Sequence, residues 1–459
     1  MKIELNLFFM SRLRSRVIEF LILLLIMVPA VLWAAPSLLV DDGSGSDEGA
    51  AKDLPSSDVL LYSLNLELMQ QLWLGEADRL NLPVNGQNVE FRKTRKIIRD
   101  RNITWEGVDA SGHVRVLLTL GKDHVYGRII GEFGTMALGP DSVRGVSAAA
   151  ASVAEGSASR VGVRQLDPEK EVEFGDDYLV PPQAAASEQQ IQQAAIASED
   201  GSRIDVMVLY TNGMAAAHPG DQINTRIQYL VDLGNQSFSN SGINTRFNLV
   251  HAQKVVYPDD SSGDMPEALY SLTDNTGVFS GVEELRTRYG ADQVVLLRQY
   301  VDEGCGLAWI LQGYSADARN AYAVVQDGSK TDGSGYYCSE LSYVHEIGHN
   351  FGCNHDRANS NSSGRYEYSY GYQSPAENFR TVMAYNCSGG CPRVAHFSNP
   401  DVQYQGEATG VLYTAANSAD NVRTINQTRI EMANYRAAVI NDKTGTGYLS
   451  GIFLLLLDH

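Results

Sequence analysis

The sequence has 459 residues, about three domains at roughly 150 residues each. With 44% hydrophobic and 20% charged residues it can bury a core and is not a disordered polyelectrolyte. Its 36 basic and 55 acidic residues give a formal net charge of −19 at pH 7. Because binding to phosphates needs clustered Lys and Arg, we expect no nucleic-acid partner.

Residues 1–34 are expected to be a secretory signal peptide. Three arginines precede an apolar run over residues 20–32, and small residues follow it. A run of about 13 apolar residues fits a signal peptide, whereas a membrane span needs about 20. An uncleaved membrane anchor is the alternative. We therefore expect a secreted, extracellular protein whose mature form has no stable membrane span and whose cysteines can form disulfides.

The next part of the chain, residues 35–145, is expected to form a small β-rich propeptide domain. Two β-branched runs, 113–120 and 125–130, are separated by Gly-Lys-Asp, which predicts a hairpin. The basic stretch 92–101 is interpreted as a solvated strand face, or alternatively as a docking surface. Residues 146–202 are rich in Ala, Ser and Gln and predict a low-complexity linker or processing region.

From residue 203 to residue 438 the sequence alternates strand and helix signals, which indicates a mixed sheet covered by helices. Apolar runs predict strands, and helical spacing predicts helices, over the following ranges: strands at 204–210, 246–256 and 292–297, and helices at 221–241, 282–289 and 424–438. The tail 439–459 ends in six apolar residues, too few to span a bilayer, and we assign it no role.

The most informative segment is LSYVHEIGHNFGCNHD, residues 341–356. Apolar residues recur through it at helical spacing, so His345 and His349, four residues apart, lie on one helix face within reach of one ion. Gly352 can take the left-handed conformation that ends a helix. His355 then completes a three-histidine site with one position open for water. Glu346 lies next to the metal without binding it.

The spacing of this motif separates it from histidines buried in an ordinary core. A bare HExxH is expected by chance in about one chain per hundred of this length. Requiring Gly352, His355 and Asp356 as well lowers that chance to about one in a million. The segment therefore predicts a metal site.

The motif HExxHxxGxxHD, followed by Arg380-Thr-Val-Met-Ala-Tyr385, resembles the metzincin zinc endopeptidases. Asp356 makes it most similar to the reprolysin or adamalysin branch. The resemblance covers roughly residues 203–438 and implies an α/β (α+β) fold with a mixed twisted sheet, a long active-site helix and a smaller C-terminal subdomain. It also implies that Met383 forms an apolar floor beneath the metal, as the methionine turn does in this family.

Two further features follow from the resemblance. Tyr385 departs from the adamalysin pattern and is similar to the Met-x-Tyr of astacins and serralysins, where the tyrosine reaches the zinc or the tetrahedral intermediate. It is therefore a candidate oxyanion donor, with a purely structural tyrosine as the alternative. Residues 304–310 resemble the edge strand that pairs with an extended substrate in metzincins, with an ordinary internal strand as the alternative.

All five cysteines lie at residue 305 or beyond, and the first 304 residues contain none. A Cys305–Cys338 disulfide would tie the expected edge strand to the segment before the metal helix. Of the other three we prefer Cys353 with Cys387 over Cys387 with Cys391. Because no cysteine lies in the expected propeptide, a thiolate cannot block the zinc there. Latency would come from occlusion or from a carboxylate that reaches the zinc, unless the propeptide acts chiefly as a folding aid.

We therefore expect a secreted zinc metalloendopeptidase, made as a preproenzyme, that acts on polypeptides. One zinc ion held by His345, His349 and His355 would polarise the scissile carbonyl and lower the pKa of its water toward about 7. Glu346 would act as base and then acid, and Tyr385 would steady the oxyanion. The alternatives are a silent binding or adhesion module on this scaffold and a zinc amidase or deacetylase. Calcium stays open, since no D-x-D-x-D-G loop supports it.

Overall fold

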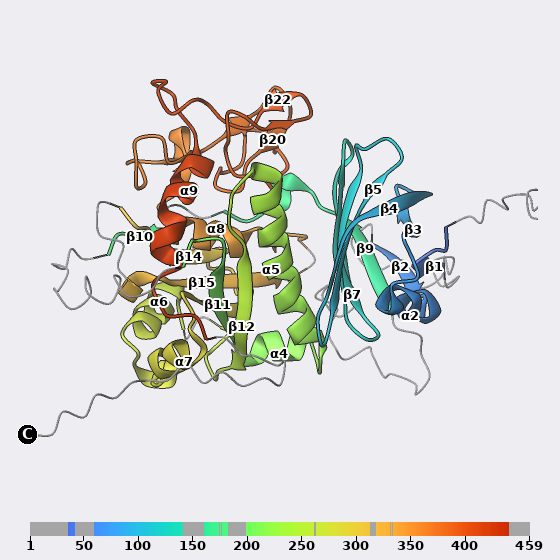
Figure 1. The fold of residues 1–459 in the computed structure, drawn as a ribbon, viewed down its shortest axis with the longest axis horizontal. Coiled ribbons are helices and arrows are strands. Elements are labelled where there is room, and N and C mark those ends of the chain that lie inside the picture. The colour runs from blue at the N-terminus through green and yellow to red at the C-terminus, as the bar shows by residue number, and fades with distance from the viewer. Residues whose placement is uncertain are drawn as a thin grey trace, which may run out of the picture.

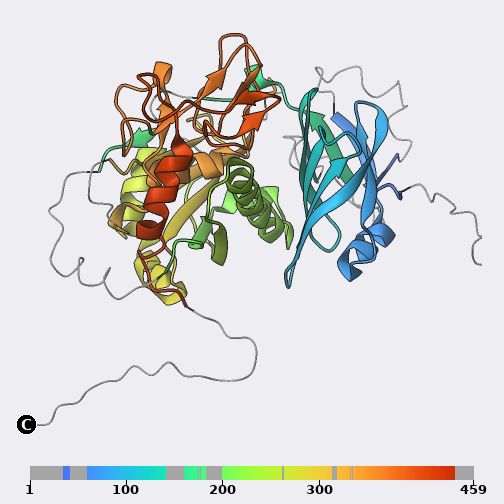
Figure 2. The same ribbon diagram turned by 45° about the horizontal axis from the view of Figure 1, so that its top comes forward.

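The computed structural model describes residues 35–41, 59–140, 160–173, 175, 177–181, 199–260, 263–312, 318–330, 332 and 334–439. They form two lobes that lie side by side, one coloured blue to cyan and one coloured mainly green to red (Figure 1, Figure 2). The expected signal peptide and nearly all of the tail 439–459 lie outside the described residues. Within those described ranges, no helix is both long enough and apolar enough to cross a bilayer.

The N-terminal lobe is a nine-stranded antiparallel sheet with one helix, α2, packed against it. Leu68 and Leu72 of α2 join Leu80, Phe91 and Trp105 of the sheet in one buried core. The elements are β1 (Leu39–Val40), β2 (Val59–Leu64), α2 (Leu66–Leu74), β3 (Arg79–Val84), β4 (Gln87–Ile98), β5 (Ile103–Asp109), β6 (Arg115–Leu120), β7 (Val125–Gly131), β8 (Gly134–Pro140) and β9 (Arg160–Gln165), in the sheet order β1-β2-β9-β8-β7-β6-β5-β4-β3.

One strand of this sheet lies where a linker was expected. The stretch 146–202 contains β9, which pairs with β2 on one side and β8 on the other, so a linker over its whole length is wrong. Val161 and Val163 lie two residues apart, with Gly162 between them and arginines on either side, and are each 1% exposed, as expected for a strand with one buried face. The Ala- and Ser-rich composition of the whole stretch hid this short signal. The predicted hairpin is observed as β6 and β7.

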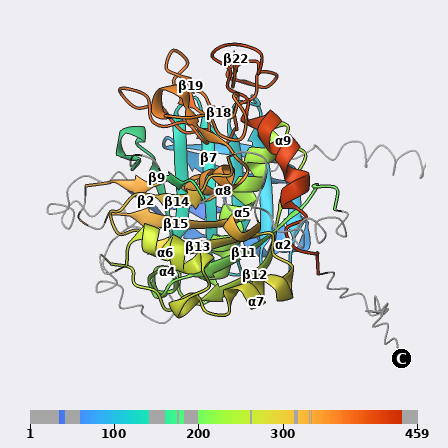
Figure 3. The ribbon, with the colours of Figure 1, turned by 90° about the vertical axis from the view of Figure 1, so that its left-hand side faces the viewer.

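The C-terminal lobe has a mixed sheet in the order β10-β14-β15-β13-β11-β12, with β16 paired to β15. All its neighbours are parallel except β14 and β16, which run antiparallel to β15. In Figure 3 the C-terminal lobe faces the viewer, and β14 lies on the side of the sheet that is nearest to the orange C-terminal segments. The strands are β10 (Tyr178–Leu179), β11 (Ile204–Tyr210), β12 (Phe247–Lys254), β13 (Gln293–Gln299), β14 (Gly306–Trp309), β15 (Tyr322–Ser329) and β16 (Tyr337–Cys338).

The helices of this lobe are α4 (Asn212–Ala217), α5 (Gln222–Ser241), α6 (Met265–Thr273), α7 (Val282–Tyr289), α8 (Ser342–Asn350) and α9 (Asn421–Met432), with short 3₁₀ turns at Gly277–Phe279, Ala318–Asn320 and Arg357–Asn359. A further 3₁₀ turn, Pro168–Lys170, follows β9. Between α8 and α9 the chain forms loops with three small two-stranded sheets made of β17 (Asn354–Asp356) and β18 (Tyr370–Gly371), β19 (Gln373–Ser374) and β20 (Phe379–Arg380), and β21 (Gln403–Tyr404) and β22 (Glu407–Ala408).

Two helices differ from their predicted bounds. The helix expected at 424–438 is α9, which begins earlier because the Asp420 side chain accepts a hydrogen bond from the Arg423 N–H at 2.9 Å and caps it. The expected long active-site helix is wrong in length, since α8 has only nine residues. It is short because Gly352, at φ 89°, turns the chain back immediately after it.

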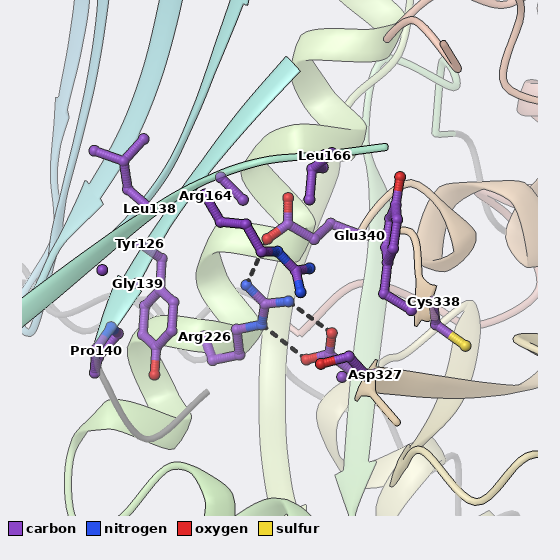
Figure 4. A pocket seen from close by; sticks show the side chains of 15 residues that line it. Tyr126, Leu138, Gly139, Pro140, Arg164, Leu166, Arg226, Asp327, Cys338 and Glu340 are labelled. Atoms are coloured by element: carbon purple, nitrogen blue, oxygen red, sulfur yellow. Dashed lines mark hydrogen bonds and ion pairs between the residues drawn. The ribbon is translucent and has the colours of Figure 1, made fainter. Parts of the chain in front are cut away.

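Helix α5 lies between the two lobes and carries most of their polar contacts. Arg99 at the end of β4 forms an ion pair with Asp232 of α5 at 2.7 Å, so the end of the basic stretch 92–101 docks on the other lobe. Arg95, in the same stretch, instead pairs with Glu106 of its own sheet. Figure 4 shows the neighbouring interface pocket, where Arg226 of α5 lies between Asp327 and Glu340 opposite Tyr126 and Leu138 of the N-terminal sheet.

Candidate active site

Helix α8 places His345 and His349 on one face, and the turn after it brings His355 beside them. Gly352 N–H donates to the His349 carbonyl at 2.8 Å and ends the helix. A Cβ at Gly352 would lie 2.9 Å from the Leu311 carbonyl oxygen, so the turn needs glycine for space as well as for its φ. Strand β17 then continues from this turn and carries His355.

The three imidazoles converge with one carboxylate, that of Asp177. One ligand atom from each of the four residues lies within 4.8 Å of all the others. Asp177 oxygens lie 3.2 Å from His345 Nε2, 3.1 Å from His349 Nε2 and 2.6 Å from His355 Nε2. The three histidine side chains are at most 1% exposed. Burial opposes ionisation of Asp177, but His355 and then His345 hold its pKa well below the usual value.

The hydrogen bonds behind the imidazoles fit a metal site. His345 Nδ1 donates to the Val382 carbonyl at 2.8 Å, and His349 Nδ1 donates to the Cys353 carbonyl at 2.9 Å. These bonds place the proton on Nδ1 and leave the Nε2 lone pair directed at the shared point, as in metal-binding histidines. Three imidazole nitrogens and one oxygen are a donor set that suits zinc. The residues present therefore fit the ion that the motif implies.

Glu346 follows His345 and lies at the same site, buried, and its Oε2 has no hydrogen-bond partner among the described residues. Burial, and next the Asp177 carboxylate, raise the pKa of Glu346 well above its usual value. Gly306 of β14 makes room for it, because a Cβ there would overlap the Glu346 carboxylate. The position of Glu346 thus depends on a glycine in the neighbouring strand.

The segment that contains Met383 and Tyr385 packs against α8 and against His355. Met383 is fully buried in the main core, and a Cβ on Gly348 of α8 would overlap its sulfur. The Tyr385 ring centroid lies 4.0 Å from that of His355, and its hydroxyl donates to the Gly175 carbonyl. Burial, then the Asp177 and Glu346 carboxylates, raise the pKa of Tyr385.

Asp356, the last residue of the motif, ties the third histidine to this segment. Its carboxylate accepts hydrogen bonds from the Tyr385 N–H at 3.0 Å, the Ala358 N–H at 3.1 Å and the Asn359 amide at 2.9 Å. The sequence singled out Asp356 only as part of a pattern. Its contacts give it a physical role, which is to fix the backbone of His355 and Tyr385 relative to each other.

The disulfides agree with one of the two expected pairings. Cys305–Cys338 is present, whereas the preferred Cys353–Cys387 pairing is wrong, because Cys387 is bonded to Cys391. Cys353 is a buried free thiol. A Gly-Gly pair between Cys387 and Cys391, with φ of 88° and 78°, lets the chain turn tightly enough for the short loop to close.

The strand expected at residues 304–310 is observed as β14, and residues 171–181 run along its outer side. Tyr178 and Leu179 form β10, which pairs in parallel with Ala308 and Trp309. The Ala308 N–H donates to the Asp177 carbonyl at 3.2 Å. This segment lies in the site and was missed, because its acidic run EVEFGDDYLV was included in the expected linker.

The same segment places two further carboxylates in the site, both bound by arginines of the C-terminal lobe. Glu171 pairs with Arg380 at 2.8 Å and with Arg393 at 3.0 Å. Glu173 also pairs with both, lying 3.0 Å from Arg393. Burial opposes ionisation of Glu171, but Arg380 and Arg393 hold its pKa below the usual value.

Comparison with known proteins finds relatives of the C-terminal lobe. Residues 200–398 match the reprolysin-type family model of metallopeptidase family M12. Three relatives are each named peptidyl-Asp metalloendopeptidase. One from Stenotrophomonas maltophilia (strain R551-3) is 34% identical over 53% of this chain and 55% of its own length. One from Xanthomonas campestris pv. campestris is 30% identical over 56% and 58%, and one from Pseudomonas aeruginosa is 28% identical over 55% and 44%.

The chain spans about half the length of these relatives, from 44% to 58%. Among solved structures, metalloproteinase-II from Bacteroides fragilis aligns over 60% of this chain and 81% of its own, with 13% identity and a TM-score of 0.37, which is too low to support an argument. The family match and the relatives agree with the motif. Together with the motif, these matches support a metzincin-type metalloprotease over residues 200–398.

Proposed function

We propose that this chain is the precursor of a secreted zinc metalloendopeptidase that is kept inactive by its own residues 171–181. The observation that carries the proposal is the meeting of three imidazoles and the Asp177 carboxylate at one point, with buried Glu346 in the wall of the adjoining cavity. The names of the relatives support peptide-bond hydrolysis. They also support a preference for bonds next to aspartate.

In the active enzyme His345, His349 and His355 would hold one zinc ion, fixed in orientation by their Nδ1–H bonds and by the Asp356 contacts. The ion supplies a Lewis acid and a water made acidic enough to lose a proton near neutral pH. Glu346 takes that proton and passes it to the leaving amine. The Tyr385 hydroxyl, released from the Gly175 carbonyl, donates a hydrogen bond to the oxyanion.

In the precursor, Asp177 would take the place of water and substrate. Its segment pairs with β14, the strand that would otherwise bind an extended substrate by main-chain hydrogen bonds. The Asp177 carboxylate lies where all three imidazoles point, and Tyr385 is hydrogen-bonded to the same segment. Latency therefore follows from occlusion and from a carboxylate at the metal together, and removal of the segment is required for activity.

The test is cleavage of a generic unfolded protein, such as casein, by the purified secreted protein and its Glu346→Ala variant. We expect cleavage by the wild type, reversible inhibition by a zinc chelator, and loss of cleavage in the variant. Glu367→Ala is the matched control, since Glu367 is exposed and remote from the imidazoles. Zinc bound in stoichiometric amount without cleavage, after residues 35–181 have been removed, would contradict the proposal and favour a binding module or a narrow amidase.

A further inference from the structure

Two arginines of the metallopeptidase domain are buried beside the metal site, Arg380 with a fully buried side chain and Arg393 with 4% of its side chain exposed. Within the described ranges, every ion pair of these two guanidinium groups is made with Glu171 or Glu173. Both partners belong to the segment whose removal the proposed function requires. Once it leaves, two buried cations lose their counter-charges.

The two arginines are held differently. Arg380 also donates to the carbonyls of Cys391 at 3.0 Å and Ala384 at 2.9 Å, so the protein backbone fixes its place. Arg393, among the residues that the structure describes, directs its guanidinium only to the two glutamates. The Arg393 side chain is thus the one that would be left with no acceptor.

Arg393 is close to the groups that would carry out hydrolysis. It lines a cavity of about 170 Å³ together with His345, Glu346 and Glu173. The cavity wall also includes Glu303, but that carboxylate forms an ion pair with Arg298 at 3.5 Å and does not neutralise Arg393. The Glu346 carboxylate lies in the same wall but forms no ion pair with Arg393 among the described residues. An anionic side chain of a peptide bound across the site would therefore meet a cation that no described carboxylate of this domain pairs with.

A buried unpaired charge is costly, whereas a guanidinium that accepts a carboxylate in a fixed fork geometry binds it strongly. We propose that Arg393, supported by Arg380, is the residue that recognises an acidic substrate side chain next to the scissile bond, and that Glu171 and Glu173 stand in for that side chain in the precursor. This inference rests on the proposed function and names the part of the site that sets its specificity.

The test compares two peptides that are identical except for Asp or Asn next to the cleaved bond. The wild-type protein, in its cleavage-competent form, should favour the Asp peptide in kcat/KM by about 100-fold or more, since an unpaired buried charge is costly. Arg393→Gln should reduce that ratio to near unity while the Asn peptide is still cleaved. Arg393→Lys should give an intermediate ratio, because it keeps the charge and loses the fork. Arg429→Gln, on the remote face of α9, is the control and should leave the ratio unchanged.

A second measurement does not depend on the folding of any variant. A synthetic peptide of residues 168–181 should inhibit the wild-type enzyme, and replacing both Glu171 and Glu173 by Gln should weaken inhibition by about 10-fold or more. Equal inhibition by the two peptides, or an Asp/Asn ratio that Arg393→Gln leaves intact, would overturn the inference. Wild-type cleavage of casein with no preference for Asp would overturn it while the proposed function stands. No cleavage of any substrate would contradict the proposed function, and this inference with it.

Discussion

Oδ1 of Asp177 lies 2.6 Å from Nε2 of His355, although the two residues are 178 positions apart in the sequence. The contact joins the segment that follows the N-terminal sheet to the last histidine of the metal motif. The same oxygen lies 3.1 Å from His349 Nε2. One side chain therefore ties the segment that follows the N-terminal sheet to the point where catalysis is expected.

Replacing Asp177 by Ala should weaken latency. The main-chain pairing with β14 would remain, but the carboxylate at the imidazoles would be lost, so the segment should leave more readily. We expect the lag before casein cleavage to be about 10-fold shorter for the variant precursor than for the wild type, because a buried charged contact is lost. Asp274→Ala, at an exposed position at the end of α6, is the control. An unchanged lag would show that Asp177 has no part in latency.

Gly306→Ala should displace the Glu346 carboxylate and lower activity without loss of the metal. The new Cβ would overlap the Glu346 carboxylate and force it away from the site. We expect kcat to fall by about 100-fold or more, in the range of losing a general base, while zinc content measured by atomic absorption stays near one ion per chain. Ala308→Gly in the same strand is the control, since it adds no atoms. Full activity of Gly306→Ala would show that Glu346 does not need this space.

The cysteine pairing predicts one free thiol per chain. Cys353 is buried, so it should not react with a thiol reagent in the native protein and should react after denaturation without reductant. Burial, and next Asp420, raise its pKa well above the usual value, which also disfavours reaction. Peptide mapping of the labelled, denatured protein should place the label on Cys353. A label on Cys391 would instead support the Cys353–Cys387 pairing.

His218 should make the contact between the lobes sensitive to acid. Its Nδ1 is hydrogen-bonded to Tyr126 of β7 at 2.8 Å, and burial, then Arg226, lower its pKa to about 3. The folded protein resists protonation of His218, whereas the unfolded chain takes up a proton below its pKa of about 6.5. The contribution of His218 to the free energy of unfolding is therefore complete above about pH 6.5 and is lost as the pH falls toward about 3. In that range the free energy of unfolding falls by at most about 1.4 kcal/mol per pH unit because of His218.

The measurement is the thermal midpoint of the precursor between pH 7 and pH 4, for the wild type and His218→Gln. The variant should lose less stability on acidification, because glutamine keeps a hydrogen-bonding group and does not titrate. His396, whose pKa burial lowers to about 4, titrates in both proteins, so the difference between the two curves isolates His218. Parallel curves would rule out His218 as the acid-sensitive contact.

The sequence predicted those parts of the molecule that local pattern determines. Strands β11 and β13 and helix α5 follow from uninterrupted apolar periodicity, and the meeting of His345 with His349 follows from helix geometry. The place of His355 depended on Gly352, whose positive φ was expected from its position after the helix.

Most of the missed features are long-range contacts. Nothing near Asp177 in the sequence indicates that it lies against His355, and the pairing of β10 with β14 joins residues more than a hundred positions apart. The choice between Cys353 and Cys391 as the partner of Cys387 was decided by a Gly-Gly turn that brings Cys391 back. Composition could not reveal Arg393 as part of the site, because its partners Glu171 and Glu173 lie in the stretch 146–202, which was expected to be a low-complexity linker.

The nine-stranded sheet and the segment proposed to block the site belong to one continuous stretch of sequence, residues 35–181, which precedes the C-terminal lobe and is joined to it through residues 182–198. While that connection is intact, the segment competes for the cleft at the high effective concentration of an attached ligand, whatever the amount of protein. A single cut in the connection would turn it into an ordinary inhibitor whose occupancy depends on concentration. Under the proposed latency, dilution without further proteolysis would then be sufficient to free the site.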